Sequence, residues 1–187
     1  MRPIALLLCA MLSASPAAAQ REAISPSLST EDAASAFQDA VLSTCVPAVA
    51  GGAGVNALPA AAKARVQASS DPVTRQQLGA AADEDVWDVV SGKGVVLIRE
   101  KAGRCVVSVY GPPVVPTILS VAHGLSGSPG FERLVSAPPP NGFGQSLMKI
   151  ENGKRLMVQL NGSEPGMPGH KSRFSVVTAT VFASPAG

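Results

Sequence analysis

Apolar residues recur at intervals of four near the start of the regular part of the chain. They are Ala33, Phe37, Val41 and Cys45. This spacing predicts one apolar face of an amphipathic helix, capped by Ser29 or Thr30. Pro47 is expected to end the helix, because proline has no backbone N–H and its ring clashes with the preceding turn. Cys45 therefore lies on the apolar face, in the last turn of the predicted helix.

Two shorter helical segments are expected before the first strand. Leu58–Gln67 is rich in alanine and predicts a weak helix. Asp71-Pro72 followed by Gly79 has the order of a cap, a proline near the start and a glycine after the end. A third helix is therefore predicted between Asp71 and Gly79.

From Val86 onward the pattern is that of strands separated by turns. The predicted strands of the first group, which form a meander, are Val86–Val90, Val95–Arg99 and Cys105–Tyr110. In the last of them Cys105, Val107 and Val109 share one face. Cys105 is therefore expected to point into the core, within reach of Cys45.

A further helix is expected before a second group of strands. Val115–Leu125 has helical periodicity, and Asn152-Gly153 is a strong signal for a tight hairpin turn. The strands predicted around that turn and at the end of the chain are Phe131–Val135, Gln145–Ile150, Leu156–Asn161 and Phe174–Phe182. The pattern predicts an α+β fold with N-terminal helices packed on a mostly antiparallel sheet and one further helix between two strand groups. No internal repeat is visible in the sequence.

The first residues have the organisation of a secretory signal peptide. Arg2 precedes an apolar run, Ile4–Leu12, and small residues end in Ala17-Ala18-Ala19 before Gln20. We expect Sec-type export with cleavage near Ala19-Gln20, which leaves a flexible segment at 20–28 and a single domain at 29–187. The expected location is the periplasm or the medium, and we expect no later apolar stretch to approach membrane-spanning length.

Cleavage changes the charge and the cysteine count. The chain has 15 Lys and Arg against 13 Asp and Glu, so losing Arg2 leaves 14 against 13 and a net charge of about +1. Such a charge is too small for strong attraction to nucleic acid. Cys9 is also removed, and Cys45 and Cys105 are expected to form a disulfide in an oxidising compartment. The alternative is a pair of separate buried thiols.

Residues suited to catalysis or metal binding are few. His123 lies near Ser126 and Ser128, which suggests an envelope hydrolase, yet the G-x-S-x-G motif of serine hydrolases is absent. His123 and His170 together suggest a metal carrier, but they lack metal-site spacing. We therefore assign no catalytic, cofactor-binding or metal-binding residue from sequence, and expect no cofactor.

Two other features are candidate sites for an anionic group, and the first of them, a glycine motif, is expected to be a flexible loop. Gly52–Ala57 fits the dinucleotide pattern G-x-G-x-x-A, but a helix rather than a strand is predicted before it. Five basic residues fall around the second hairpin, where they form either a site for an acidic partner or an ordinary solvated face. They are Lys149, Lys154, Arg155, Lys171 and Arg173.

Phe37 and Cys45, Trp87 and the run Gly103–Val107 (GRCVV) resemble a group of small exported proteobacterial proteins with no assigned activity. The resemblance implies an envelope location, and it assigns a function to no residue of this chain. The predicted export, the expected disulfide and the lack of a catalytic constellation lead us to expect a non-catalytic module that binds a protein or another envelope component. The edge of the C-terminal hairpin and the Pro-rich loops are the expected contact surfaces. The alternative is the hydrolase that uses His123 with Ser126 or Ser128.

Overall fold

The structure, a computed structural model, describes residues 30–90, 96–101, 103–135 and 143–185. The predicted signal peptide, the segment 20–28 and most of the Pro-rich loop lie outside these residues. The helical elements are α1 (Thr30–Ala40), a π turn (Val41–Cys45), α2 (Val46–Gly51), a 3₁₀ turn (Val55–Ala57), α3 (Ala60–Lys63), α4 (Pro72–Leu78) and α5 (Val114–Ser126). The strands are β1 (Val66–Ala68), β2 (Asp85–Val89), β3 (Val96–Lys101), β4 (Arg104–Tyr110), β5 (Glu132–Leu134), β6 (Phe143–Glu151), β7 (Lys154–Ser163) and β8 (Val176–Pro185).

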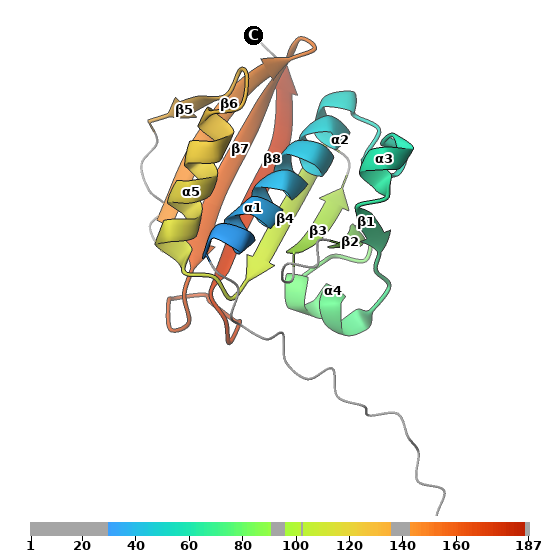
Figure 1. The fold of residues 1–187 in the computed structure, drawn as a ribbon. Coiled ribbons are helices and arrows are strands. Elements are labelled where there is room, and N and C mark those ends of the chain that lie inside the picture. Colours follow the sequence, from blue (N-terminus) through green and yellow to red (C-terminus); the bar gives the residue numbers. More distant parts are fainter. Residues whose placement is uncertain (1–29, 91–95, 102, 136–142, 186–187) are drawn as a thin grey trace, which may run out of the picture.

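All eight strands form one sheet in the order β1-β2-β3-β4-β8-β7-β6-β5, and every pairing is antiparallel. Helices α1 and α5 lie side by side on one face of this sheet (Figure 1). The predicted α+β fold is confirmed, including the further helix between two strand groups. We call the face covered by α1 and α5 the helix face and the opposite side the outer face.

The strand order is symmetrical about the contact between β4 and β8. Each half of the chain contributes a helix, a short edge strand and a three-stranded meander, with α1 heading the first half and α5 the second. The sequence showed no internal repeat, so the two halves share an arrangement of elements without a recognisable sequence pattern. Edge strands of three residues, β1 and β5, close the sheet at both ends, and such short edges discourage pairing with another chain.

Pro47 does not end the first helix, which corrects the expectation from sequence. The π turn Val41–Cys45 follows α1 directly, and the N–H of Val46 bonds to the carbonyl of Val41. Pro47 then falls in the first two positions of α2, where a missing N–H costs little. The widened turn carries the chain past the proline, and the helical path continues to Gly51. Gly52 ends it with a φ of 71°, a left-handed conformation that suits glycine.

The predicted helix Leu58–Gln67 is also wrong in extent. The structure has only the four-residue α3 there, followed by β1, whose residues pair with β2. Tertiary pairing with the sheet thus overrides a weak local preference for helix. The helix between Asp71 and Gly79 is confirmed: the Asp71 carboxylate accepts hydrogen bonds from the N–H groups of Val73 and Thr74, and Gly79 ends α4 with a φ of 61°.

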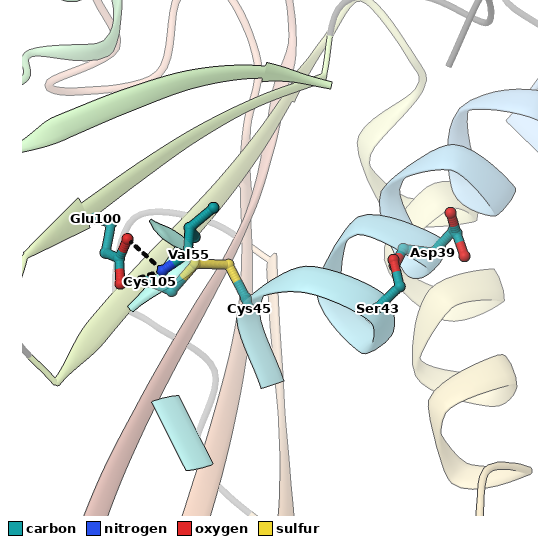
Figure 2. Close-up of a disulfide and its surroundings, with 6 residues drawn as sticks. All are labelled: Asp39, Ser43, Cys45, Val55, Glu100 and Cys105. Atoms are coloured by element: carbon teal, nitrogen blue, oxygen red, sulfur yellow. Dashed lines mark hydrogen bonds between the residues drawn. A yellow bond between two sulfur atoms is a disulfide. The ribbon is translucent and has the colours of Figure 1, made fainter. Parts of the chain in front are cut away.

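The helix-face core confirms the predicted apolar pattern. Ala33, Phe37, Val41 and Cys45 are all fully buried. Cys45 and Cys105 lie at disulfide distance, with their Cα atoms 5.4 Å apart, so the predicted pair joins the first helical segment to the central strand β4 (Figure 2). The hairpin prediction is also confirmed, with positive φ at Asn152 and Gly153 between β6 and β7.

One described helical stretch, the 21 residues Glu31–Gly51, is long and apolar enough to cross a membrane by length and composition. This finding corrects the expectation that no later stretch approaches spanning length. In the most apolar window of that stretch 67% of the residues are buried inside the fold, where they pack against the sheet. The same residues therefore form the core of the helix face.

Candidate functional site: two cavities beside helix α2

Helix α2 lies between two cavities. Val46 and Pro47 line one of about 380 Å³, and Ala48 and Val49 line another of about 260 Å³. The π turn directly precedes α2, and such turns occur frequently at functional sites. The region around α2 is therefore the candidate functional site.

The larger cavity, which we call the groove, is mainly apolar. One wall comes from the helical segment and the other from the residues after α5 and from β6. Its lining residues are Leu42, Val46, Pro47, Ser128, Pro129, Phe131, Lys149 and Glu151. Among the described residues, β5 pairs only with positions 146–148 of β6, so the part of β6 that lines the groove lies beyond the end of β5.

An ion pair forms the polar part of the groove. Lys149 Nζ lies 2.9 Å from Glu151 Oε2, and both side chains stand on the helix face of β6. The same Nζ lies 5.6 Å from the centre of the Phe131 ring, within range of a cation–π interaction. The groove thus combines apolar lining residues with a cation and an anion that remain partly accessible to solvent.

Two contacts hold α2 at both ends. Cys45, immediately before α2, is tied to Cys105 of β4. At the other end Lys154 Nζ donates a hydrogen bond of 3.0 Å to the carbonyl of Ala50, and a cation at a helix C-terminus is favourable. The cavities on either side are consequently separated by a helix fixed to β4 and to the β6–β7 hairpin.

The smaller cavity is acidic. Asp83, Asp85 and Glu100 line it together with Lys101 and the glycine loop after α2. Both carboxylate oxygens of Glu100 accept the Val55 N–H, at 3.1 and 2.9 Å (Figure 2). Burial raises the pKa of Glu100, the Val55 bond lowers it, and the charge of Asp85 raises it again. Burial is the largest of these effects, so the net shift of the Glu100 pKa is upward.

The other acidic residue with a defined partner is Asp83. Its carboxylate lies 2.5 Å from Lys101 Nζ. The hydrogen bond from Lys101, followed by its charge, lowers the pKa of Asp83, and the same pair raises the pKa of Lys101. Among the described residues, no group of three or more His, Cys, Asp or Glu side chains is arranged to hold a metal ion.

The glycine loop is shaped around Glu100. A Cβ added at Gly54 would lie 2.6 Å from Glu100 Oε1, and Gly54 has a φ of 78°. Glycine is therefore needed for close approach and for backbone conformation. Within the Gly52–Ala57 motif, the Val55 N–H that could meet an anion is already bonded to a carboxylate.

The residues of the predicted hydrolase do not meet. Ser126 Oγ donates to the Ala122 carbonyl at 2.7 Å, and Ser128 Oγ donates to the Gly124 carbonyl at 3.2 Å. Both hydroxyls thus donate to carbonyls of α5, while His123 lies exposed in the last turn of that helix. His170 is bonded to Ser163 at the end of β7, near the start of α5. The two histidines therefore lie at opposite ends of that helix.

A serine–histidine pair that sequence reasoning missed joins Ser163, the last residue of β7, to His170 in the loop between β7 and β8. Ser163 Oγ and His170 Nδ1 are 2.7 Å apart, and His170 Nε2 lies 2.9 Å from the Phe174 carbonyl oxygen. A carbonyl only accepts, so Nε2 carries a proton, and when the ring is neutral Nδ1 accepts the serine hydroxyl. The seven-residue spacing in an irregular loop gave no periodic signal.

The five basic residues do not form one face. Lys149 and Lys154 stand on the helix face near the β6–β7 turn, whereas Arg155 stands on the outer face. Lys171 and Arg173 lie in the β7–β8 loop, at the opposite end of the strands. The interpretation as a continuous anion-binding face is therefore wrong.

Comparisons of the chain with protein-family models, with curated proteins and with solved structures found no match. The function is accordingly inferred from the geometry of the cavities and of the sheet.

Proposed function

We propose that this protein is an exported, non-catalytic binding module that holds an apolar segment of a partner protein in the groove. The observation that carries the proposal is a cavity of about 380 Å³ with Leu42, Val46 and Phe131 among its lining residues. Ligand sites are typically concave, mainly apolar and of about 300–1,000 Å³, with a few polar groups that orient the ligand. The Lys149–Glu151 pair supplies such groups.

Export is the second part of the proposal. The run Ile4–Leu12 and the small residues before Gln20 support cleavage by signal peptidase. Cys45 and Cys105 at disulfide distance fit an oxidising compartment, where such pairs persist. N-terminal sequencing of the protein recovered from the envelope fraction should begin near Gln20, and recovery with Met1 intact would contradict this part.

The groove is tested by selecting binders from a random peptide library against the folded domain and against the variant Leu42→Glu. Leu42 is partly buried and lines the groove, so a carboxylate there should oppose entry of an apolar side chain. We expect peptides selected on the wild type to bind Leu42→Glu at least about tenfold more weakly, equivalent to about 1.4 kcal/mol.

Leu119→Glu is the matched control, because Leu119 is 52% exposed on α5 and does not line the groove. It should bind the selected peptides as the wild type does. Lys149→Glu serves as a second groove variant, since it changes the charge without touching a fully buried position. Equal peptide affinity in wild type, Leu42→Glu and Lys149→Glu would refute the groove as the binding site.

Hydrolysis is the second candidate function, and one observation favours it. Ser163, His170 and the Phe174 carbonyl supply a nucleophile, a base and a group that orients the base. A fluorophosphonate probe should then label the wild type and leave Ser163→Ala unlabelled, with Ser128→Ala labelled as the control. Absence of labelling in the wild type would refute a reactive Ser163.

A further inference from the structure

The outer face of the sheet carries one row of directly paired residues across five strands. Glu132 on β5 pairs with Met148 on β6, Met148 with Met157 on β7, Met157 with Phe182 on β8, and Phe182 with Arg104 on β4. Directly paired residues share a face of the sheet. The next positions, Leu147, Val158 and Val181, are fully buried on the helix face, which places this row on the outer face.

This row is complementary to itself. Over these five strands an acidic residue stands at one end, a basic residue at the other, and Met157 at the centre. The register continues to Lys101 on β3, a position that would lie beyond the edge strand β5 of the second copy. A two-fold axis parallel to the strands and passing over Met157 would place Glu132 of one copy over Arg104 of the other. It would also place Met148 over Phe182, a favourable sulfur–aromatic contact, and Met157 over its own counterpart.

The neighbouring row repeats the pattern with different chemistry. Leu134, Ser146, Gln159, Thr180 and Val106 are paired in the same way. The same axis places the hydroxyl of Ser146 near that of Thr180, and Gln159 against Gln159, while Val106 is itself buried. Aligned sheets pack with strands about 30° apart, so these matches hold closest to the axis.

The open part of the outer face approaches the area of a small interface. Leu78 of α4 forms one buried cluster with Val86, Leu97 and Tyr110, and β4 is buried from Cys105 to Tyr110. The open part is therefore β5 to β8 together with Arg104. At about 4.8 Å between strands and about 3.4 Å per residue, β5 to β8 offer about 500 Å². The smaller stable interfaces bury about 600 Å² on each partner, which is close to this area. Ile150, which stands on this face, is 62% exposed.

We propose that this protein forms a symmetric dimer in which two copies of the outer face pack against each other. The self-complementary charge at Glu132 and Arg104 selects a second copy as the partner, because an isologous interface joins one patch to itself. The groove opens on the helix face, so dimer formation leaves it accessible. The dimer therefore stands independently of the proposed binding of a partner segment.

Charge reversal tests the proposal. Sedimentation equilibrium over a concentration series should show a dimer for the wild type. Glu132→Arg alone and Arg104→Glu alone should each weaken the dimer by at least about tenfold, because each creates two contacts between like charges in the dimer. The double variant E132R/R104E restores both attractions and should dimerise as the wild type does.

Mixing the two single variants gives the sharpest outcome. The arginine introduced at position 132 of one chain would face the glutamate introduced at position 104 of the other, and the remaining wild-type pair would also be complementary. A heterodimer should therefore form from two chains that are monomeric alone. Glu31→Arg, an exposed position on the helix side, is the control for net charge and should leave the dimer intact. A wild type that stays monomeric at high micromolar concentration, or a dimer indifferent to both reversals, would overturn the proposal.

Discussion

Asp85 and Glu100 lie directly opposite each other on β2 and β3, at the edge of the acidic cavity. Like charges in this position are destabilising. The Val55 N–H donates a hydrogen bond to the Glu100 carboxylate, and this bond stabilises the carboxylate in its place beside Asp85. Repulsion between Asp85 and Glu100 is thus offset by the hydrogen bond with which Glu100 caps the 3₁₀ turn Val55–Ala57.

The pH dependence of stability should therefore change when Glu100 is replaced by glutamine. Because the pKa of Glu100 is raised in the folded protein, the folded state binds more protons than the unfolded state. The contribution of Glu100 to the free energy of unfolding is fully present below the ordinary glutamate pKa. It is lost as the pH rises through the raised pKa of the folded protein. Glu100→Gln removes this loss and keeps an acceptor, so its unfolding free energy relative to wild type should increase from about pH 4 to about pH 7.

Urea denaturation at both pH values measures the effect. Glu100→Ala is the contrasting variant, because it removes the acceptor and should cost about 1–3 kcal/mol at either pH. Asp85→Asn should follow Glu100→Gln in direction. A relative stability of Glu100→Gln that is independent of pH would contradict the raised pKa.

Removal of the disulfide should lower stability substantially. The two cysteines are 60 residues apart in sequence, and closing a loop of that length is worth about 4 kcal/mol in the chain-entropy model. The double variant C45A/C105A should lose about that amount in guanidinium denaturation. Reduced wild type should unfold at nearly the same denaturant concentration as the variant, and equal stability of oxidised and reduced wild type would show that the pair is not bonded.

Two glycines at the contacts of α5 should respond differently to alanine. A Cβ at Gly162 would overlap the buried Val114 side chain and lie 2.9 Å from Ile118 Cδ1. Gly162→Ala should cost about 1–3 kcal/mol, because α5 would have to lift from β7. At Gly124 the obstacle is the flexible end of Gln38, so Gly124→Ala should cost nothing and gain up to about 1 kcal/mol of helix propensity. Thermal melting of both variants gives the comparison, and similar losses would argue against the close approach of α5 to Gly162.

Lys154 should couple the hairpin to α2. Lys154→Met keeps the aliphatic stem and removes the donor to the Ala50 carbonyl. We expect a loss of about 0.5–1.5 kcal/mol, together with faster amide hydrogen exchange in α2. Lys171→Met, in the distant β7–β8 loop, is the control. Unchanged exchange in α2 would contradict a role for Lys154 in fixing that helix.

Most elements of the fold could be predicted from the local periodicity of apolar residues. The face of α1, the meander and the Asn152-Gly153 turn could be predicted because each pattern spans consecutive residues. The continuation of the helical path past Pro47 could not be predicted. A π turn has no distinct sequence signal, and proline usually ends a helix. β1 was missed because an alanine-rich segment favours helix until a neighbouring strand pairs with it.

The candidate site was harder to predict from the sequence than the fold. Leu42, Phe131 and Lys149 come from segments far apart in the chain, and they meet only when α1 and α5 lie together on the sheet. The Ser163–His170 bond likewise depends on how an irregular loop folds back. Cys45 and Cys105 are the exception, because the apolar pattern around each cysteine and the expectation of an oxidising compartment were enough to predict the pair.

The central position of β8 has a consequence for biosynthesis. β8 is the last described strand in the chain, yet it lies between β4 and β7 and joins the two halves of the sheet. A nascent chain therefore cannot complete this sheet until β8 has left the ribosome. In a product truncated before Val176, no strand would join the two halves of the sheet.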